Sequence, residues 1–425
     1  MASFSIPLTG LDADSTALNT IANNLTNMST TAYKAQSTQF ADLFYQQIGS
    51  SGSGDPIEVG AGVKVATNET DFSQGSISST GANTDVALDG SGLFVVDSGN
   101  GSYEYTRAGN FSLTSSGSLV TANGLDVMGY PAVNGVVNTN ASLAAITIPV
   151  GQVQQPQASS SFSMAANLDA AATTGTTFPG QVTIYDSLGE SHVVTVTYTQ
   201  TAANTWNFSA ALPAADFASG VSTPINGSLT FGPSGNLTSV TSGGVTSTVG
   251  TAAGDVSSIP LSFNGLTDGA ANLNINWNLL GTNNTPNIGQ VDAASAVSST
   301  TQDGYPAGQY QSFTIGTDGT VTVTYSNGQK QNVGQLALAN VSNEQGLNKL
   351  GNGDYATTLA SGTASIGVSG SAGLGTVQDG ALEGSNVNIS QEFSDLIVAQ
   401  RAFEASSKAV TTFDSVTQET INMIH

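Results

Sequence analysis

Residues 10–34 read GLDADSTALNTIANNLTNMSTTAYK, and apolar side chains recur among them with the period of an α-helix. The recurrence forms a single narrow seam of the coiled-coil type, which predicts a helix over residues 9–28. A helix of about 20 residues with one such seam is marginal by itself, so we expect it to pack against partner helices. The seam consists of Leu11, Leu18, Ile21, Leu25 and Met28.

The far end of the chain supplies a candidate partner. Neither glycine nor proline interrupts residues 386–425, and apolar side chains recur there at intervals of seven, with others that widen the stripe. Asn388 stands where a helix-capping residue would lie. At 1.5 Å per residue, a helix over this segment would be about 60 Å long. The stripe includes Ile389, Phe393, Leu396, Phe403, Val410, Phe413 and Ile424.

Between these ends the apolar period becomes two, which is typical of half-buried β-strands. Residues 182–200 (VTIYDSLGESHVVTVTYTQ) predict two strands around a polar turn, and residues 227–240 and 313–338 repeat that plan. Asp-Gly, Ser-Gly and Asn-Gly pairs punctuate the strands, as in short hairpins. We therefore expect a mainly β fold with α-helical termini and two nested antiparallel β domains of sandwich or barrel type. Residues 40–48 (FADLFYQQI) resemble a short second helix.

Changes in composition suggest the domain boundaries. Stretches rich in small polar residues, glycine and proline separate the patterned segments. We expect one β domain to be inserted into another whose halves lie on either side of it. The expected parts are a terminal helical domain (1–34 and 386–425), connecting segments (35–74 and 376–385), a β domain in two halves (75–150 and 298–375) and an inserted β domain (151–297).

Charge and cysteine content exclude several classes of function. The 425 residues include seven Lys and Arg together, and the formal net charge is −23. A nucleic-acid partner requires a basic patch that these scattered cations cannot build, and the same deficit disfavours anionic membranes. There is no cysteine, which excludes disulfides and thiolate chemistry. No apolar run is long enough to span a membrane, and no basic residue precedes Lys34, so we expect neither membrane insertion nor a cleaved signal peptide.

No constellation for catalysis, a cofactor or a metal emerges from the sequence. A Ser-His-Asp triad could use only His192 or His425, the two histidines of the chain. His192 lies in an alternating stretch beside a turn, and we interpret it as a surface strand residue. Neither histidine has a metal-ligand partner three or four residues further on. Paired carboxylates for glycoside hydrolysis stay open, but we expect a protein that is not an enzyme.

The two ends together resemble one known family. Residues 10–34 are similar to the N-terminal motif of the bacterial flagellar rod, hook and hook-associated proteins, and residues 380–424 are similar to its C-terminal motif. The likeness covers most of residues 1–150 and 298–425 and is weak across 151–297. The motif residues are Ala22, Asn23, Asn24, Leu25, Asn27, Tyr33 and Lys34, followed near the other end by Glu383, Ser385, Asn386, Val387, Ala399, Gln400 and Arg401.

Two positions depart from the family's pattern. Ala32 stands where the family has glycine, and Gly384 stands where it has alanine. The geometry of the turn before Tyr33 therefore does not follow from the resemblance. Neither replacement disturbs the helical seams.

The resemblance implies a structural role. In this family the terminal helices pair as the innermost, coiled-coil-like layer of a tube, flanking β segments form a middle layer, and an inserted domain lies outside. The seam residues would then bury against helices of the same and neighbouring subunits, and the ends of isolated subunits would be disordered. Length and the single modest insertion favour a hook subunit, which forms a flexible, curved tube and transmits torque as a universal joint. A distal rod or hook-filament junction protein is the nearer alternative, and a secreted β-rich adhesin or surface-layer protein is the remote one.

The resemblance also implies partners and a location. The first partner is the chain itself, in a helical homopolymer. The others are the flagellar rod, the hook cap, the hook-length control protein, the hook-filament junction proteins and the flagellar type III export apparatus. The subunit would lie outside the cell, in the hook of the flagellar basal body, after export without a cleaved signal peptide. The missing cysteines are compatible with passage as an unfolded thread.

Overall fold

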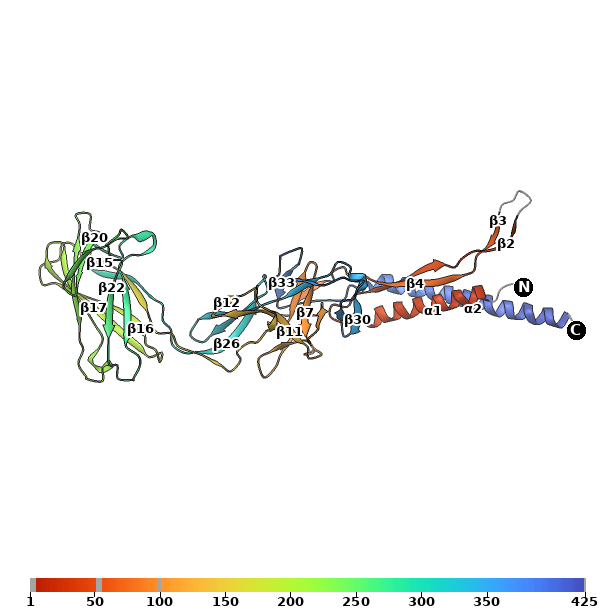
Figure 1. Cartoon of the computed structure of the whole chain (residues 1–425), viewed down its shortest axis with the longest axis horizontal. Helices are drawn as coiled ribbons and strands as arrows, with labels where there is room; N and C mark the ends of the chain where they lie inside the picture. Colours follow the sequence, from red (N-terminus) through yellow and green to blue (C-terminus); the bar gives the residue numbers. More distant parts are fainter. Residues whose placement is uncertain (1–4, 51–55, 98, 100, 424–425) are drawn as a thin grey trace. The chain divides into compact units, whose positions relative to one another are not determined.

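The computed structural model describes residues 5–50, 56–97, 99 and 101–423. Strands predominate among these residues, and the α-helices lie at the two ends of the chain, as the apolar periods predicted (Figure 1). Contacts within the chain divide it into two compact units, which are described separately below. Unit 1 comprises residues 1–150, 312–324 and 330–425, and unit 2 comprises residues 151–311 and 325–329.

Helices α1 (Ser5–Thr26) and α2 (Ile389–Met423) confirm the helical ends. α1 begins and ends slightly earlier than the predicted range of 9–28. α2 begins after Asn388, whose Oδ1 accepts hydrogen bonds from the backbone N–H groups of Ser390 (3.1 Å) and Gln391 (3.3 Å). This is the N-cap that satisfies otherwise unpaired donors at a helix start. Within the described ranges, no helix is long and apolar enough to cross a membrane.

The two helices lie side by side and antiparallel in unit 1 (Figure 1). Ser406 Oγ donates a hydrogen bond of 2.9 Å to Asp14 Oδ2. Gly10 faces the same serine, and a Cβ at this position would lie 3.3 Å from Ser406 Oγ, so a small residue permits the close approach here. Because α2 has 35 residues and α1 has 22, the C-terminal part of α2 extends past α1.

The segment after α1 forms hairpins, and the second helix predicted at residues 40–48 is wrong. β1 (Gln36–Asp42) pairs antiparallel with β4 (Val63–Thr70), and β2 (Gln46–Ser50) pairs antiparallel with β3 (Pro56–Val59). Phe40, Phe44 and Tyr45 gave the helix-like pattern, but all three side chains are exposed. They pack on no core that would favour a helix, and pairing with a strand further along the chain decides the conformation.

The β part of unit 1 is built around one large sheet. Its strands, with two short extra pairs, are β5 (Ile77–Ser79), β6 (Val86–Asp89), β7 (Leu93–Asp97), β8 (Tyr103–Thr106), β9 (Ser112–Leu113), β10 (Leu119–Val120), β11 (Asp126–Val133), β12 (Val136–Val137), β13 (Ala144–Ala145), β27 (Thr320–Tyr325), β28 (Lys330–Leu336), β29 (Leu338–Asn340), β30 (Asn348–Gly351), β31 (Asp354–Ala356), β32 (Ser365–Gly367), β33 (Thr376–Asp379) and β34 (Ala381–Glu383). The central path of the sheet runs β27-β28-β11-β7-β8-β31-β30. The extra pairs, β33 with β6 and β34 with β5, bring the segment before α2 onto the segments that precede the sheet strands.

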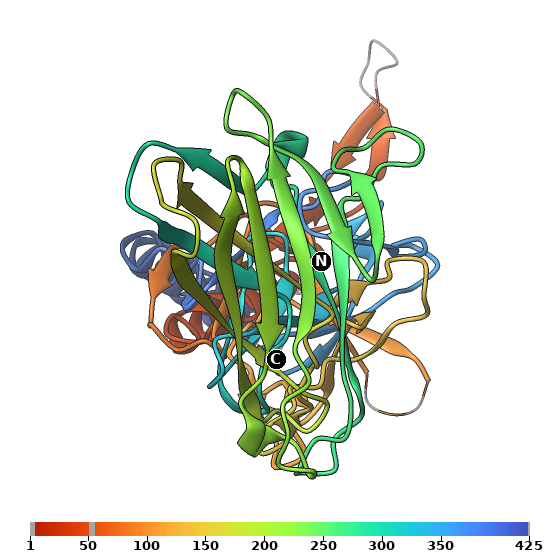
Figure 2. The same ribbon diagram turned by 90° about the vertical axis from the view of Figure 1, so that its left-hand side faces the viewer.

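Unit 2 contains two β-sheets that share one core; its strands, olive to green, face the viewer in Figure 2. Its strands are β14 (Val153–Gln154), β15 (Ser161–Asp169), β16 (Thr177–Tyr185), β17 (Ser191–Ala202), β18 (Thr205–Ala211), β19 (Ile225–Phe231), β20 (Leu237–Ser242), β21 (Val245–Thr248), β22 (Ser258–Phe263), β23 (Leu273–Asn278), β24 (Ile288–Val291), β25 (Ala296–Gln302) and β26 (Gly308–Ile315), the last continuing into unit 1. One sheet runs β16-β17-β18-β19-β20-β21, and the other runs β22-β23-β15-β24 with β25 also on β15. Burial alternates along β15 and β17, so one face of each strand supplies the core. Trp277 lies in it, with ring centroids 5.3 Å from Phe208 and 6.0 Å from Phe162.

Three details of unit 2 differ from the sequence-based expectations. β15 pairs in parallel with β23 and β24, although we expected antiparallel domains. Long connections join these strands, so no tight turn imposes an antiparallel direction. The expected boundary at residue 297 falls inside β25, whose pairing with β15 continues to Gln302. His192 is buried, with 5% exposure, and the surface interpretation is wrong because two carboxylates pair with its ring at an inward position of β17.

Candidate functional site

Motif residues from the two chain ends meet in one buried polar cluster of unit 1. Glu383, at the end of β34, lies at its centre with a side chain that is 1% exposed. Its Oε1 is 2.7 Å from Lys34 Nζ, and its Oε2 is 2.6 Å from Arg107 Nε. The backbone N–H of Gly75 donates to Oε1 at 2.8 Å. One carboxylate thus joins the segment after α1, the segment before α2 and the residue that follows β8.

Arg107 extends this cluster into the β part of unit 1. Its Nη2 donates to the carbonyls of Leu88 (2.7 Å) and Gly90 (2.6 Å), and its Nη1 donates to the carbonyl of Gly92 (2.6 Å). The guanidinium therefore holds the turn between β6 and β7 while it pairs with Glu383. Such a network satisfies buried charges, which would otherwise be costly to remove from water.

Burial and pairing act in opposite directions on the pKa values of this cluster. Burial by itself raises the pKa of Glu383, but the charge of Arg107 and the hydrogen bonds from Lys34 and Arg107 outweigh it, and the net pKa is lowered. Burial lowers the pKa of Lys34, against the opposing effect of Glu383. Lys34 Nζ also donates to the carbonyl of Ser73 at 2.7 Å. Glu383 is therefore the anion that holds the cluster together at neutral pH.

Asn386 ties the same segments together through its amide. Its Oδ1 accepts a hydrogen bond of 2.7 Å from the backbone N–H of Ala35, and its Nδ2 donates to the carbonyl of Asp71 at 2.8 Å. Its own N–H donates to the carbonyl of Tyr33 at 3.3 Å. The segment between β34 and α2 is thereby fixed to Ala35, just before β1, and to Asp71, just after β4.

Asn24 performs the same task at the C-terminal end of α1. The residue is 1% exposed, and its amide makes four hydrogen bonds. Nδ2 donates to the carbonyl of Gln36 (2.8 Å) and to Glu392 Oε1 (2.9 Å), and Oδ1 accepts from Gln36 N (3.0 Å) and Tyr33 Oη (3.2 Å). These bonds use the full donor capacity of the amide. Asn24 therefore joins α1, β1 and the first turn of α2.

The turn between α1 and Tyr33 adopts a left-handed backbone at Ala32, where φ is 55°. Its N–H donates to the carbonyl of Glu383 at 2.8 Å, so the turn is docked on the buried cluster. Side chains with a Cβ disfavour this conformation, and glycine accepts it. The turn thus has the left-handed geometry that suits the glycine found in the family, and this chain has an alanine at that position.

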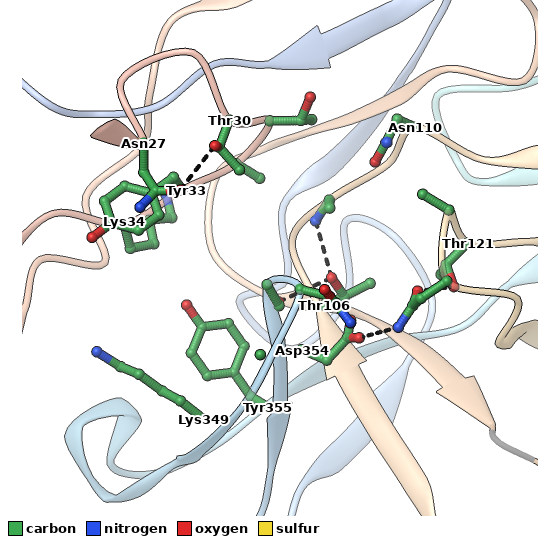
Figure 3. Close-up of a pocket in the computed structure, with 18 of the residues that line it drawn as sticks. Asn27, Thr30, Tyr33, Lys34, Thr106, Asn110, Thr121, Lys349, Asp354 and Tyr355 are labelled. Carbon is green, nitrogen blue, oxygen red and sulfur yellow. Dashed lines mark hydrogen bonds between the residues drawn. The ribbon is translucent and has the colours of Figure 1, made fainter. Parts of the chain in front are cut away.

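A cavity of about 560 Å³ in unit 1 is lined in part by Lys34 of this cluster (Figure 3). The turn residues Thr30, Tyr33 and Lys34 form part of its lining, and Asp354 and Tyr355 of β31 form another part. Asp354 Oδ2 accepts a hydrogen bond of 2.6 Å from Asn123, and burial raises the pKa of Asp354. Burial also raises the pKa of Tyr355 to about 12. The cavity is lined with hydrogen-bonding groups and lies where the segment after α1 meets the sheet.

The helical seam residues lie less deeply than the polar cluster. Those that are partly buried are Leu11, Leu18, Ile21, Leu25, Leu396, Phe403, Val410 and Phe413. Met28, Ile389 and Phe393 are exposed, and Ile424 lies outside the described residues. Among the other motif residues, Ala399 is buried, Asn27, Ser385 and Val387 are partly buried, and Ala22, Asn23, Gln400 and Arg401 are exposed.

Arg107 is a site residue that was not predicted from the sequence. A signal was available, because the chain has seven Lys and Arg in all and Arg107 directly follows an alternating β segment. Gly75 and the carbonyls of the β6–β7 turn act through their backbone, so their side chains carry no signal of this role.

Family models match four segments of the chain. The matches are residues 7–34 with the flagella basal body rod protein, 87–172 with the flagellar hook protein FlgE/F/G D1 domain, 157–305 with the flagellar basal body protein FlaE D2 domain, and 378–423 with the flagellar basal body rod FlgEFG protein C-terminal region. Helical ends fastened to a β unit, together with these matches, define a structural protein of the flagellar rod and hook class.

Full-length relatives narrow this class. The chain is 34% identical to the flagellar hook protein FlgE of Salmonella typhimurium, over 99% of this chain and 100% of that protein. It is 33% identical to the hook protein of Treponema pallidum, over 98% of each chain, and 32% identical to that of Escherichia coli K12, over 99% of each. The chain belongs to the flagellar hook protein family and is a structural subunit of the bacterial flagellar hook.

A solved structure supports the fold. The crystal structure of the Helicobacter pylori flagellar hook protein FlgE2 matches 71% of this chain and 99% of that one, with a TM-score of 0.52 and 15% identity. The inserted segment, where the resemblance is weak, lies almost wholly within the D2 match and within the full-length alignments.

Proposed function

We propose that the chain polymerises through its terminal helices into a flexible, curved tube that transmits torque as a universal joint. The observation that carries this proposal is the apolar surface that α2 leaves exposed in the single chain. Ile389, Phe393 and Ile397 are 45%, 54% and 59% exposed and recur every four residues, so they form one stripe. Several large apolar side chains together on a surface mark an interaction site.

This stripe differs from the seam that contacts α1. Leu396, Ala399 and Phe403 are partly or fully buried, and Ser406 further along the seam hydrogen-bonds to Asp14 of α1. The seam thus supports coiled-coil-like pairing within one subunit and leaves the exposed stripe for neighbouring subunits. Fully burying a large apolar side chain contributes roughly 1.5–3 kcal/mol, so half-exposed side chains repeated at every contact would hold the tube together.

The β units would supply the flexible outer contacts. Charged residues make up 9% of the chain, and Gly, Ser, Thr and Asn are abundant. Contacts between small polar side chains are hydrated and can exchange partners at modest cost. We infer that β1–β4, the sheet of unit 1 and unit 2 form layers outside the helices, and that these layers slide on one another as the tube turns.

Family membership also supports a set of partners and a location. We infer that the subunit contacts the rod, the hook cap, the hook-length control protein and the hook-filament junction proteins, and that the type III export apparatus exports it without a cleaved signal peptide. It would then lie outside the cell. Immunogold labelling with an antibody against unit 2 tests the position. We expect label along the short curved segment between rod and filament, and label confined to the rod or to a narrow band at the filament base would contradict it.

Charge placed on the exposed stripe tests the polymer interface. We expect Phe393→Glu and Ile397→Glu subunits to fold, because both side chains are exposed, and to lose polymerisation because a carboxylate would be buried at each contact. Ser394→Glu is the matched control, since it places the same charge on the same turn but outside the stripe, and it should polymerise. Sedimentation and electron microscopy of hooks measure the result. Normal tubes from the Phe393→Glu and Ile397→Glu chains would refute the interface.

A further inference from the structure

We propose that unit 2 carries a divalent metal site formed by Asp186, His192 and Asp268. One ligand atom from each residue lies within 4.8 Å of the other two. His192 Nε2 and Asp186 Oδ2 are 3.2 Å apart. Metal–ligand bonds of about 2.0–2.2 Å place neighbouring ligand atoms at about this separation. The site is independent of the helical interface and goes beyond the role in the hook.

Each carboxylate is oriented by the backbone. Asp186 Oδ1 accepts hydrogen bonds from the N–H groups of Leu188 (2.8 Å) and Glu190 (2.9 Å), which leaves Oδ2 facing His192. Asp268 Oδ1 accepts one from the N–H of Ala270 (3.0 Å). Each acid therefore has one oxygen held by its own turn, and a metal ion would replace the present contact of Asp186 Oδ2 with His192 Nε2.

The imidazole is oriented by a third carboxylate. His192 Nδ1 lies 2.8 Å from Asp216 Oδ2, on the side of the ring opposite the cluster. A proton on Nδ1 donated to Asp216 leaves the Nε2 lone pair facing Asp186. This carboxylate–histidine arrangement accompanies most metal-bound histidines, because it fixes the tautomer and raises the basicity of the ligand nitrogen.

The loops that carry the ligands are joined without any ion. The N–H of Thr267 donates to the carbonyl of Asp216 at 2.9 Å, and the N–H of Ala271 donates to Ser187 Oγ at 3.0 Å. The loop of Asp268, the turn of Asp186 and the short helix η1 (Ala214–Asp216) are therefore held together. Asp186 is fully buried and His192 nearly so, while Asp268 is exposed. The exposed side gives an ion a path of entry and leaves coordination positions for water.

The ligand set indicates the class of metal. One imidazole and two carboxylates suit Zn²⁺ or Mn²⁺, whereas Ca²⁺ prefers oxygen ligands throughout. Three carboxylates, those of Asp186, Asp216 and Asp268, lie around His192. A divalent cation would compensate their charge. Sequence spacing gave no hint of the site because its ligands come from a turn, a strand and a distant loop.

Zinc titration of the full-length chain, without an oligohistidine tag, tests the proposal. We expect one saturable site by calorimetry, and a higher midpoint of thermal unfolding with Zn²⁺ than with EDTA. Tryptophan fluorescence reports on the unfolding of unit 2, because the two tryptophans of the chain, Trp206 and Trp277, both lie in its core. Manganese is the second probe.

Variants separate the site from weak binding to an acidic surface. Asp268→Asn changes an exposed side chain, so the fold should persist while zinc affinity falls at least tenfold. Asp216→Asn should weaken binding by about 10–100-fold through the tautomer of His192. Asp292→Asn, an exposed acid in the same unit, is the matched control and should bind as the unaltered chain does. Absence of saturable binding of either metal, or equal affinities of the Asp268→Asn and unaltered chains, would overturn the proposal.

Discussion

At the scale of single residues, Ala32 stores backbone strain at a defined point. Its φ of 55° places it in the left-handed region, and its N–H is committed to Glu383. We expect Ala32→Gly to stabilise unit 1 by about 1 kcal/mol, because relief of the Cβ clash exceeds the entropy that glycine adds to the unfolded chain. Urea unfolding followed by circular dichroism measures this. Ala35→Gly, three residues on and outside the left-handed region, should instead be neutral or destabilising; a loss of stability in both variants would contradict the argument.

Glu383 pairs with both buried cations at the junction of the two chain ends. We expect Glu383→Gln to cost about 3–5 kcal/mol, because Lys34 and Arg107 stay buried without their anion. Glu404→Gln breaks an exposed pair with Arg401 and should cost less than about 1 kcal/mol. Unfolding followed by circular dichroism compares the two, and the tryptophan signal of unit 2 should not change. Equal costs would show that the buried network does not hold unit 1 together.

The same residue predicts how stability depends on pH. The pKa of Glu383 is lower in the fold than in the unfolded chain, where it is about 4.3, so its contribution is complete above that value and is lost as pH falls through the folded pKa. Asp354 has a raised pKa, so its contribution to stability is instead lost as pH rises. This contribution is the same in the unaltered and the Glu383→Gln chains and cancels in their difference. The difference in unfolding free energy between the unaltered and Glu383→Gln chains should be constant above about pH 5 and shrink below about pH 4. A difference that persists undiminished in acid would argue against a charged Glu383.

Sequence motifs identified several of these residues, but they did not predict the contacts that the residues make. Lys34, Glu383 and Asn386 were found through motifs, but their role was not, because a buried ion pair between residues so far apart leaves no local pattern. His192 was placed on the surface because a polar residue in an alternating strand ordinarily faces water. Its burial depends on carboxylates from a turn and from η1, which the strand itself does not reveal.

At the scale of elements, the spacing of apolar residues predicted the helices and strands whose apolar face is buried. The helical ends and the hairpins of 182–200 and 313–338 were found because one face of each is buried. Residues 40–48 were assigned wrongly because their aromatic side chains are exposed, so their spacing carries no information about a core. The joints between elements depend on buried amides, which periodicity does not detect.

Asn24 tests such a joint between elements. We expect Asn24→Asp to destabilise the packing of α1 on α2 by about 2–3 kcal/mol, because two donated hydrogen bonds are lost and a carboxylate is placed against Glu392. Amide hydrogen exchange in the first turns of α2 measures it, and exchange should accelerate there. Asn23→Asp alters the exposed neighbour and keeps the oxygen that accepts from Asn27, so it should leave exchange unchanged. Equal exchange in the two variants would mean that Asn24 does not join the helices.

At the scale of the whole molecule, the chain consists of two units with separate cores. Unit 1 contains the helices, the buried junction and its own sheet, whereas unit 2 has a core of its own. In the layered tube that we propose, the helices carry polymerisation and unit 2 contributes to the mechanics of the outer surface. The two tasks should therefore be separable by deletion.

Replacing residues 151–311 with a short Gly-Ser linker tests this separation. We expect the shortened chain to polymerise, because the exposed stripe of α2 and the cluster around Glu383 are intact, and to form tubes of altered stiffness or curvature, because the outer layer is gone. Electron microscopy measures both properties. Phe393→Glu in the same shortened chain should abolish assembly, which would show that those tubes use the same helical interface. If the shortened chain folds, as circular dichroism of α1 and α2 would establish, but forms no polymer, then unit 2 is itself part of the assembling contact and the layered arrangement is wrong.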